Sequence, residues 1–208
     1  MPRIKRAINY INALCTSEDK EKSALGEKLK RLYDKWLKTL NLQDFLEFLE
    51  AIKVNKGKIG VPQFFGKFRA YAFEEYVYKL IKAKCRVPKD LQTFWGEKCI
   101  VWLEGEGEYA YAMEFDVSIG KMVNNFVEPK VVFEAKVELD SARLKTALAS
   151  FAILKQSNPE AKCILIYLIK DFDSVLLKIA EHWADGAFQL DTKTKALDNF
   201  VSFVNKPP

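Results

Sequence analysis

The chain has little of what zinc-binding or membrane proteins need. Its 208 residues include one histidine and four cysteines, and the cysteines form no C-x-x-C pair. We therefore expect reduced thiols and no zinc site. The sequence also lacks an apolar run long enough to cross a bilayer, which argues against a membrane span. The basic N-terminal stretch lacks a long apolar core and a small-residue cleavage site, so we expect a cytoplasmic protein.

The composition is that of a chain with a full hydrophobic core. Hydrophobic residues make up 49% of the sequence, and the formal net charge is +5. This length and composition suit one domain with an appendage, and the basic balance is compatible with a polyanionic partner. Abundant Lys and Glu, with few Gln, are also typical of thermophile proteins.

The segment 1–60 is predicted to form a helical N-terminal extension to a domain at 61–208. Apolar residues recur at helical spacing from Leu25 to Leu40 and again from Phe45 to Ile52. Such stripes favour packing on the main domain or on another subunit. A DNA-recognition or dimerisation role is the alternative.

Residues 53–69 are predicted to form a basic loop. Three glycines and Pro62 interrupt the helical pattern, and lysines and an arginine lie among them. Glycine allows close approach of a backbone to phosphate, so Lys58, Lys67 and Arg69 are candidate DNA contacts. A solvated loop without a ligand is the alternative.

Residues 70–84 have the pattern of an amphipathic helix. At 100° per residue, Glu74 borders its apolar stripe, and Glu75 is expected to face solvent. Glu74 is thus a candidate site residue, or alternatively a flanking acid that pairs with a lysine.

Three strands are expected next. Residues 100–103 and 109–118 form a hairpin, and a loop at 120–130, with its turn at Asn124 and Asn125, leads to a strand at 131–137. Asp116 lies near the end of the second strand.

The strand at 131–137 places Glu134 and Lys136 on one face, because side chains alternate along a strand. Charges in an apolar strand need a partner, water or a metal. If Asp116 comes beside Glu134, two oxygen ligands converge in the way that Mg²⁺ prefers. An adjacent lysine then suits metal-assisted hydrolysis of a phosphodiester.

The rest of the chain reads as alternating helices and strands. A helix from Ser141 to about Gln156 carries Lys145, which is either a phosphate contact or an ordinary surface lysine. Residues 163–169 are apolar on both faces and predict a central parallel strand. A helix at 173–185, a short edge strand and a final helix follow.

Taken together, these residues resemble the PD-(D/E)XK nuclease superfamily, which includes restriction endonucleases and archaeal Holliday-junction resolvases. Asp116 is followed, after a gap, by the sequence Glu134, Ala135 and Lys136. Phe115 replaces the family's usual proline. The order of elements from about residue 66 to residue 185 also matches the family's α-β-β-β-α-β core, with a mixed central sheet flanked by helices.

The resemblance implies a Mg²⁺-dependent or Mn²⁺-dependent DNA endonuclease that leaves 5′-phosphate and 3′-hydroxyl ends. Asp116, Glu134 and the Ala135 carbonyl would bind the metal, with Glu74 reaching it through water or completing a second site. Lys136 would position the attacking water.

The sequence does not decide between several functions. The chain is expected to be a homodimer that acts on DNA, either as a structure-directed enzyme of a cell, virus or mobile element, or as a type II restriction enzyme. A nucleic-acid-binding protein without catalysis is also compatible with the sequence. So is an interaction protein in which Glu134 and Lys136 form a simple ion pair.

Overall fold

The structure is a computed structural model that describes residues 6–104 and 109–206. Its contacts divide the chain into two compact units, Met1–Leu80 and Ile81–Pro208. The division falls inside a helix. The boundary expected between residues 60 and 61 stays a prediction.

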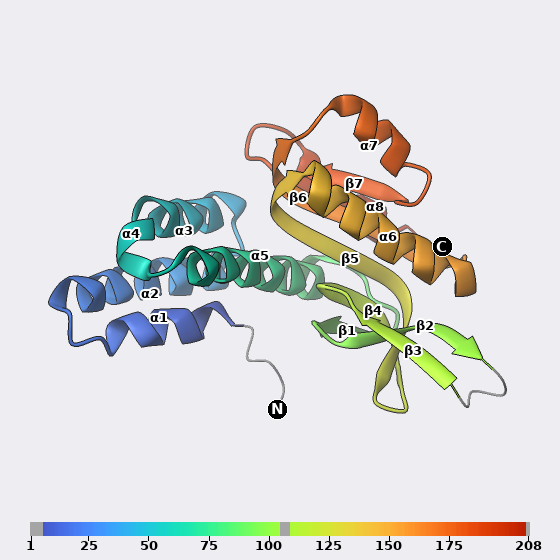
Figure 1. The fold of residues 1–208 in the computed structure, drawn as a ribbon, viewed down its shortest axis with the longest axis horizontal. Helices are drawn as coiled ribbons and strands as arrows, with labels where there is room; N and C mark the ends of the chain where they lie inside the picture. The colour runs from blue at the N-terminus through green and yellow to red at the C-terminus, as the bar shows by residue number, and fades with distance from the viewer. Residues whose placement is uncertain (1–5, 105–108, 207–208) are drawn as a thin grey trace. The chain divides into compact units, whose positions relative to one another are not determined.

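The N-terminal unit is helical. Its elements are α1 (Ala7–Cys15), α2 (Lys20–Thr39), α3 (Leu42–Val54), α4 (Lys56–Ile59) and most of α5 (Pro62–Lys84) (Figure 1). The prediction of a basic loop at 53–69 is therefore wrong, because most of this segment is helical. Pro62 begins α5, where its missing N–H costs nothing, and Gly66 lies within the helix.

Aromatic rings form the core of this unit. Trp36 meets Phe45 edge-on at 5.4 Å between ring centroids, and Phe45 stacks on Tyr76 at 4.3 Å. These rings come from α2, α3 and α5, and residues 72–77 of α5 are all buried, so α5 is packed on more than one side. Such offset and edge-on contacts add to the free energy of burial.

Glu75 is buried, which corrects the expectation that it faces solvent. Its side chain accepts a hydrogen bond of 2.8 Å from the Tyr33 hydroxyl of α2. Burial raises the pKa of Glu75, and the hydrogen bond from Tyr33 partly offsets that rise. The expectation failed because it assumed that α5 buries a single stripe.

The C-terminal unit is built on a seven-stranded mixed sheet. After the end of α5 it contains β1 (Gln92–Trp95), β2 (Lys98–Glu104), β3 (Tyr109–Glu114), β4 (Val117–Val123), β5 (Phe126–Asp140), α6 (Ser141–Ser157), β6 (Lys162–Asp171), α7 (Ser174–Ala180), β7 (Gly186–Gln189) and α8 (Ala196–Val204). The strand order is β1-β4-β5-β2-β3, and β6 pairs with both β5 and β7. The predicted central parallel strand at 163–169 is confirmed, because β6 runs parallel to β5 and β7.

The longest strand, β5, extends well beyond the predicted range of 131–137. Figure 1 shows it curving from the β4 hairpin to the start of α6. Most of the expected loop at 120–130 belongs to strands β4 and β5, which are joined by a tight turn at Asn124 and Asn125, both with positive φ. Asparagine tolerates this backbone conformation better than most residues, so the expected position of the turn is confirmed.

Helices cover both faces of the sheet. On one face, Leu144 and Phe151 of α6 pack in a buried cluster with Val132 and Leu165 of β5 and β6. On the other face, Phe200 of α8 meets β5 and β7 through their phenylalanines. Side chains thus cover the central strands β5 and β6 on both faces.

The helix expected at 173–185 ends earlier, at Ala180, and β1 has no counterpart among the expected strands. All four cysteines, Cys15, Cys85, Cys99 and Cys163, are free thiols, as expected.

Candidate metal centre

The candidate site lies where β4 begins and the second half of β5 continues beyond it. The β4 to β5 pairing starts at Val117 opposite Phe133, so β4 gives β5 no partner past that point. Asp116 directly precedes β4, and its side chain reaches the open edge of β5. It accepts a hydrogen bond of 2.8 Å from the Ala135 N–H.

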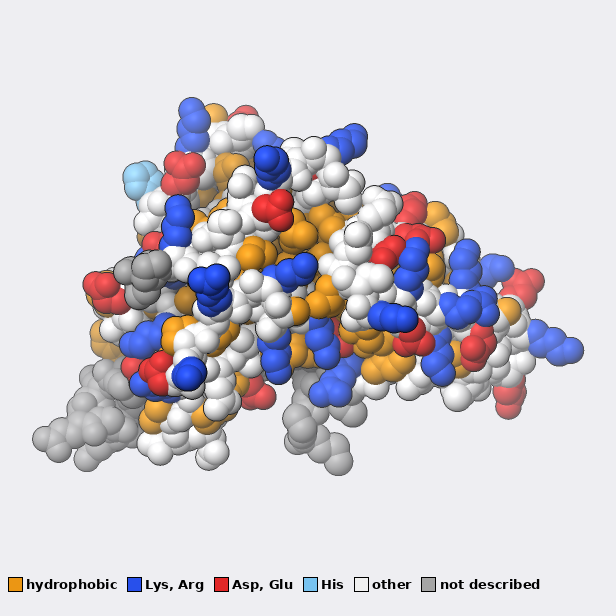
Figure 2. Space-filling view, turned by 180° about the vertical axis from the view of Figure 1, so that it is seen from behind, with side chains coloured by type: hydrophobic (Ala, Val, Ile, Leu, Met, Phe, Trp, Pro, Cys, Tyr) orange, Lys and Arg blue, Asp and Glu red, His pale blue; other side chains and the backbone are white. Residues whose placement is uncertain are grey.

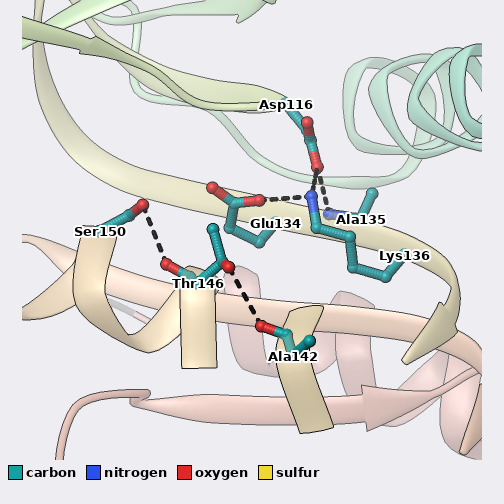
Figure 3. Close-up of polar contacts among 7 residues, drawn as sticks. All are labelled: Asp116, Glu134, Ala135, Lys136, Ala142, Thr146 and Ser150. Carbon is teal, nitrogen blue, oxygen red and sulfur yellow. Dashed lines mark hydrogen bonds and ion pairs between the residues drawn. The ribbon is translucent and has the colours of Figure 1, made fainter. Parts of the chain in front are cut away.

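Three charged side chains converge at this edge (Figure 3). The Lys136 Nζ lies 2.7 Å from Asp116 Oδ2 and 2.6 Å from Glu134 Oε2. Glu134 is buried, and Asp116 and Lys136 are mostly buried. Strand alternation brings Glu134 and Lys136 together, and the position of Asp116 before β4 brings in the third group.

The charges of the three groups do not cancel. Burial raises the pKa of Glu134 to about 7, the neighbouring Asp116 carboxylate adds to that rise, and the Lys136 ammonium opposes it. Burial by itself lowers the pKa of Lys136, but the two carboxylates outweigh burial and raise it. Two carboxylates thus compete for one ammonium, which favours a protonated Lys136 and gives the site a net negative charge once Glu134 is ionised.

These groups fit a hard divalent cation. Both carboxylates hold the same nitrogen, so one ion in place of that ammonium is within reach of both. The Ala135 N–H points to the Asp116 edge of β5, and in a strand the C=O of a residue points to the same edge as its N–H. That carbonyl is therefore on the correct side to be a third oxygen ligand.

Water would complete such a coordination sphere. In the part of the chain that the structure describes, no group of three or more His, Cys, Asp or Glu side chains is placed to hold a metal ion. Mg²⁺ commonly keeps several waters and takes only one or two carboxylates from the protein. Two carboxylates and a main-chain carbonyl are sufficient for this mode of binding.

Glu74 belongs to the N-terminal unit. It lies on α5 and is buried. Burial, Tyr71 and then Glu74 raise the pKa of Tyr10, so the Glu74 carboxylate is near that ring. Its role at the metal stays a prediction.

The four basic residues predicted to contact DNA lie on helices. Lys58, on α4, pairs with Glu21 at 2.7 Å. Lys67 is exposed on α5, and Arg69 lies over the Phe65 ring at 5.3 Å. Lys145 is exposed on α6, in the C-terminal unit. DNA contact by these four residues stays a prediction. Figure 2 shows basic side chains across one face with acidic ones between them.

Two hydroxyl groups of α6 appear beside these charged groups in Figure 3. Thr146 donates a hydrogen bond of 3.0 Å to the Ala142 carbonyl, and Ser150 donates one of 3.2 Å to the Thr146 carbonyl. The helix itself uses these donors, so we assign them no part in the metal site.

The mixed sheet and its flanking helices form a restriction-endonuclease-like fold. The structure is similar to a chain of the native A2B2 tetramer of BbvCI, a type II restriction enzyme, with a TM-score of 0.54 and 14% sequence identity. The similarity covers 97% of this chain and 89% of that one. No protein-family profile matches the sequence, and no curated protein matches it.

Within residues 6–104 and 109–206, no helix is both long and apolar enough to cross a bilayer.

Proposed function

We propose that this protein is a metal-dependent DNA endonuclease. The observation that carries the proposal is the convergence of Asp116, Glu134 and Lys136 at the open edge of β5, in a restriction-endonuclease-like fold. Burying two acids and one lysine costs free energy of desolvation. A functional role for the three groups would explain why the protein carries this cost. Hydrolysis of a phosphodiester is a use that suits all three groups.

Each group has a distinct part in the proposed reaction. Asp116, Glu134 and the Ala135 carbonyl would hold Mg²⁺ or Mn²⁺, which supplies Lewis-acid activation of water and of the phosphate when bound. The Ala135 N–H keeps the Asp116 carboxylate turned to the site. Lys136 would orient the attacking water and offset charge that develops on the phosphate.

The test is cleavage by the purified full-length chain. Supercoiled plasmid, a synthetic four-way junction and single-stranded DNA are incubated with Mn²⁺, with Mg²⁺, or with EDTA. We expect metal-dependent cleavage, and we expect Asp116→Ala and Lys136→Ala to abolish it while leaving DNA binding largely intact. The matched control is Lys178→Ala, which removes an exposed lysine of α7. Cleavage by either site variant at the wild-type rate would refute these roles.

A nucleic-acid-binding protein without catalysis is the second candidate. One observation favours it. The Lys136 ammonium already pairs with both carboxylates, in the place that a metal ion would take. Titration with Mn²⁺ separates the two candidates. Saturable binding that is lost in Glu134→Ala, but kept in the exposed control Glu181→Ala, supports the enzyme, whereas DNA binding without metal binding supports the second candidate.

A further inference from the structure

The C-terminal unit contains a cavity on the face of the sheet opposite Glu134 and Lys136. Its volume is about 620 Å³, and Val131 of β5 and Ile164 of β6 lie in its wall. Val131 and Glu134 are three positions apart along a regular stretch of β5, so their side chains point to opposite faces. The cavity is therefore separate from the candidate metal centre.

Three neighbouring strands build this cavity in the same way. Strands β4, β5 and β6 each give one lysine and one β-branched residue to the wall, as Lys121 with Ile119, Lys130 with Val131, and Lys162 with Ile164. In β4 and β6 the two are two positions apart and so share a face.

In β5 the lysine and the valine are consecutive, and a bulge explains why both line the cavity. The pairing with β4 jumps from Gly120 opposite Pro129 to Ile119 opposite Val131, which leaves Lys130 as the extra residue. Bulges re-aim side chains in this way. Each of the three strands thus presents a cation beside an apolar side chain.

Two further segments close the cavity and are tied together. The Arg86 N–H donates a hydrogen bond of 2.6 Å to the Asn205 side chain, which joins the segment after α5 to the end of α8. The Lys162 ammonium donates to the Lys206 carbonyl at 3.2 Å. These bonds hold the walls in place without a ligand, so the cavity is preformed.

The charge of the lining is strongly positive. It includes five basic side chains and two acids, Asp90 and Glu160. Asp90 pairs with Lys121 at 3.1 Å, and Lys130 lies 3.6 Å from the carboxylate of Glu128, which is outside the lining. Among the described residues, no acid lies within ion-pair distance of Arg86 or Lys206. Such a lining attracts an anion, and the exposed cations at its rim suit a phosphate group.

We propose that this cavity binds a nucleoside phosphate, either as a free nucleotide or as one nucleotide of a single strand. The apolar surface formed by Ile119, Val131 and Ile164 would lie against the base, and Arg86 and Lys130 would bind the phosphate. The volume is in the range of pockets that enclose a small organic ligand. This site does not depend on the proposed nuclease activity, because it uses different residues on the opposite face of the sheet.

The test is calorimetric titration of the full chain in EDTA, so that no metal-bound phosphate contributes. The probes are adenosine 5′-monophosphate, adenosine, inorganic phosphate and a single-stranded DNA trinucleotide. We expect one saturable site per chain for the monophosphate or the trinucleotide, whichever is the natural source, and weaker binding of adenosine and of inorganic phosphate. Arg86→Glu and Lys130→Glu should each weaken binding at least about tenfold, the factor that one hydrogen bond to a charged group contributes.

Two variants serve as comparisons. Lys89→Glu makes the same charge change at an exposed lysine of the same segment as Arg86 and outside the cavity, so it should leave affinity nearly unchanged. Lys136→Ala should also leave nucleotide affinity unchanged, even if it abolishes DNA cleavage. This variant therefore distinguishes a failure of the cavity proposal from a failure of the nuclease proposal. Both glutamate substitutions at the cavity replace exposed side chains, and a thermal unfolding scan verifies that they fold.

Several results would overturn the proposal. These are the absence of saturable binding of both the monophosphate and the trinucleotide at millimolar concentration, equal affinity for inorganic phosphate and the monophosphate, and equal weakening by Arg86→Glu and Lys89→Glu. Binding of the trinucleotide alone, weakened by Arg86→Glu and Lys130→Glu, supports the strand as the source of the nucleotide.

Discussion

At the scale of single residues, the Asp116 and Glu134 carboxylates share one ammonium group. The Lys136 side chain is the only cation that the described hydrogen bonds and ion pairs give to either acid. Removing one member of a buried charged cluster leaves the others uncompensated, which costs more than the cluster contributes. We therefore expect Lys136 to stabilise the fold, in addition to its proposed part in the reaction.

We therefore predict that Lys136→Met destabilises the metal-free protein at pH 8 by about 3 kcal/mol, the usual cost of breaking a buried ion pair. Urea unfolding followed by circular dichroism measures this change. Lys178→Met is the control, because Lys178 is exposed on α7. Equal unfolding midpoints for Lys136→Met and wild type would show that Lys136 does not offset the two acids.

The pKa of Glu134 gives a second prediction at this scale. In the folded protein it is raised to about 7 from its ordinary value of 4.5. Between these two values the folded state binds more protons than the unfolded chain, so its stability falls as pH rises. The contribution of Glu134 is fully present below pH 4.5 and is lost as pH rises through 7.

The metal-free wild type should thus lose up to roughly 3 kcal/mol of unfolding free energy between pH 4.5 and pH 8 through this group. In Glu134→Gln, which does not titrate, that part of the slope should disappear. Unfolding free energies of both proteins at pH 5, 6.5 and 8 measure it. Parallel pH profiles for the two proteins would contradict the raised pKa.

At the scale of elements, the β4–β5 hairpin positions Asp116 at the edge of β5. Gly120 of β4 is pressed against β5, and a Cβ atom added there would overlap the Glu128 carbonyl oxygen. A backbone contact cannot move aside as a flexible side chain can. The pairing of the two strands therefore requires glycine at this position.

We predict that Gly120→Ala lowers the free energy of unfolding by about 1–3 kcal/mol, as overpacking does. The matched substitution Gly66→Ala should have the opposite sign. Nothing lies within 4 Å of the added Cβ at Gly66, and alanine favours a helix over glycine by about 1 kcal/mol. Denaturant titrations of the two variants and wild type compare them. Stabilisation by Gly120→Ala would show that the close approach is absent.

Much of the β5 region could be predicted from the sequence, because the patterns that indicate it involve residues close together in the chain. Alternation alone places Glu134 and Lys136 on one face, and two asparagines mark the turn before the strand. The burial of Glu75 could not be predicted, because it depends on Tyr33. That residue is far away in the sequence and packs on a second side of α5.

The cavity lined by Lys121, Lys130 and Lys162 could not be predicted from the sequence for a similar reason. Its lining comes from five segments that fold together from residue 86 to residue 206. Lys121 and Lys130 lie between Asp116 and Glu134 in the sequence, and that position does not indicate a cavity. The bulge at Lys130, which turns that side chain to the cavity, has no sequence pattern of its own.

At the scale of the whole molecule, the chain joins a helical unit to a sheet-based unit through one continuous helix, α5. For the endonuclease activity proposed above, two cleavage sites in one assembly would be useful, because they could cut both strands of a duplex or both arms of a junction. We propose a homodimer for this reason.

Light scattering after size exclusion should therefore give twice the 23.9 kDa mass of one chain. The measurement is made at several protein concentrations with and without a DNA duplex, because DNA binding can promote association. A protein mass that stays at that of a single chain, including with bound duplex, would contradict the homodimer.

The regular stretch of β5 from Val131 to Lys136 constrains how this protein can vary. One strand carries the charged cluster on one face and part of the cavity wall on the other, so an insertion of one residue between Val131 and Glu134 would turn the acid and Lys136 into the α8 layer. Point substitutions can tune either face alone, whereas a change in length disrupts both at once. Insertions and deletions should therefore be tolerated in the connections around β5 far more readily than within it.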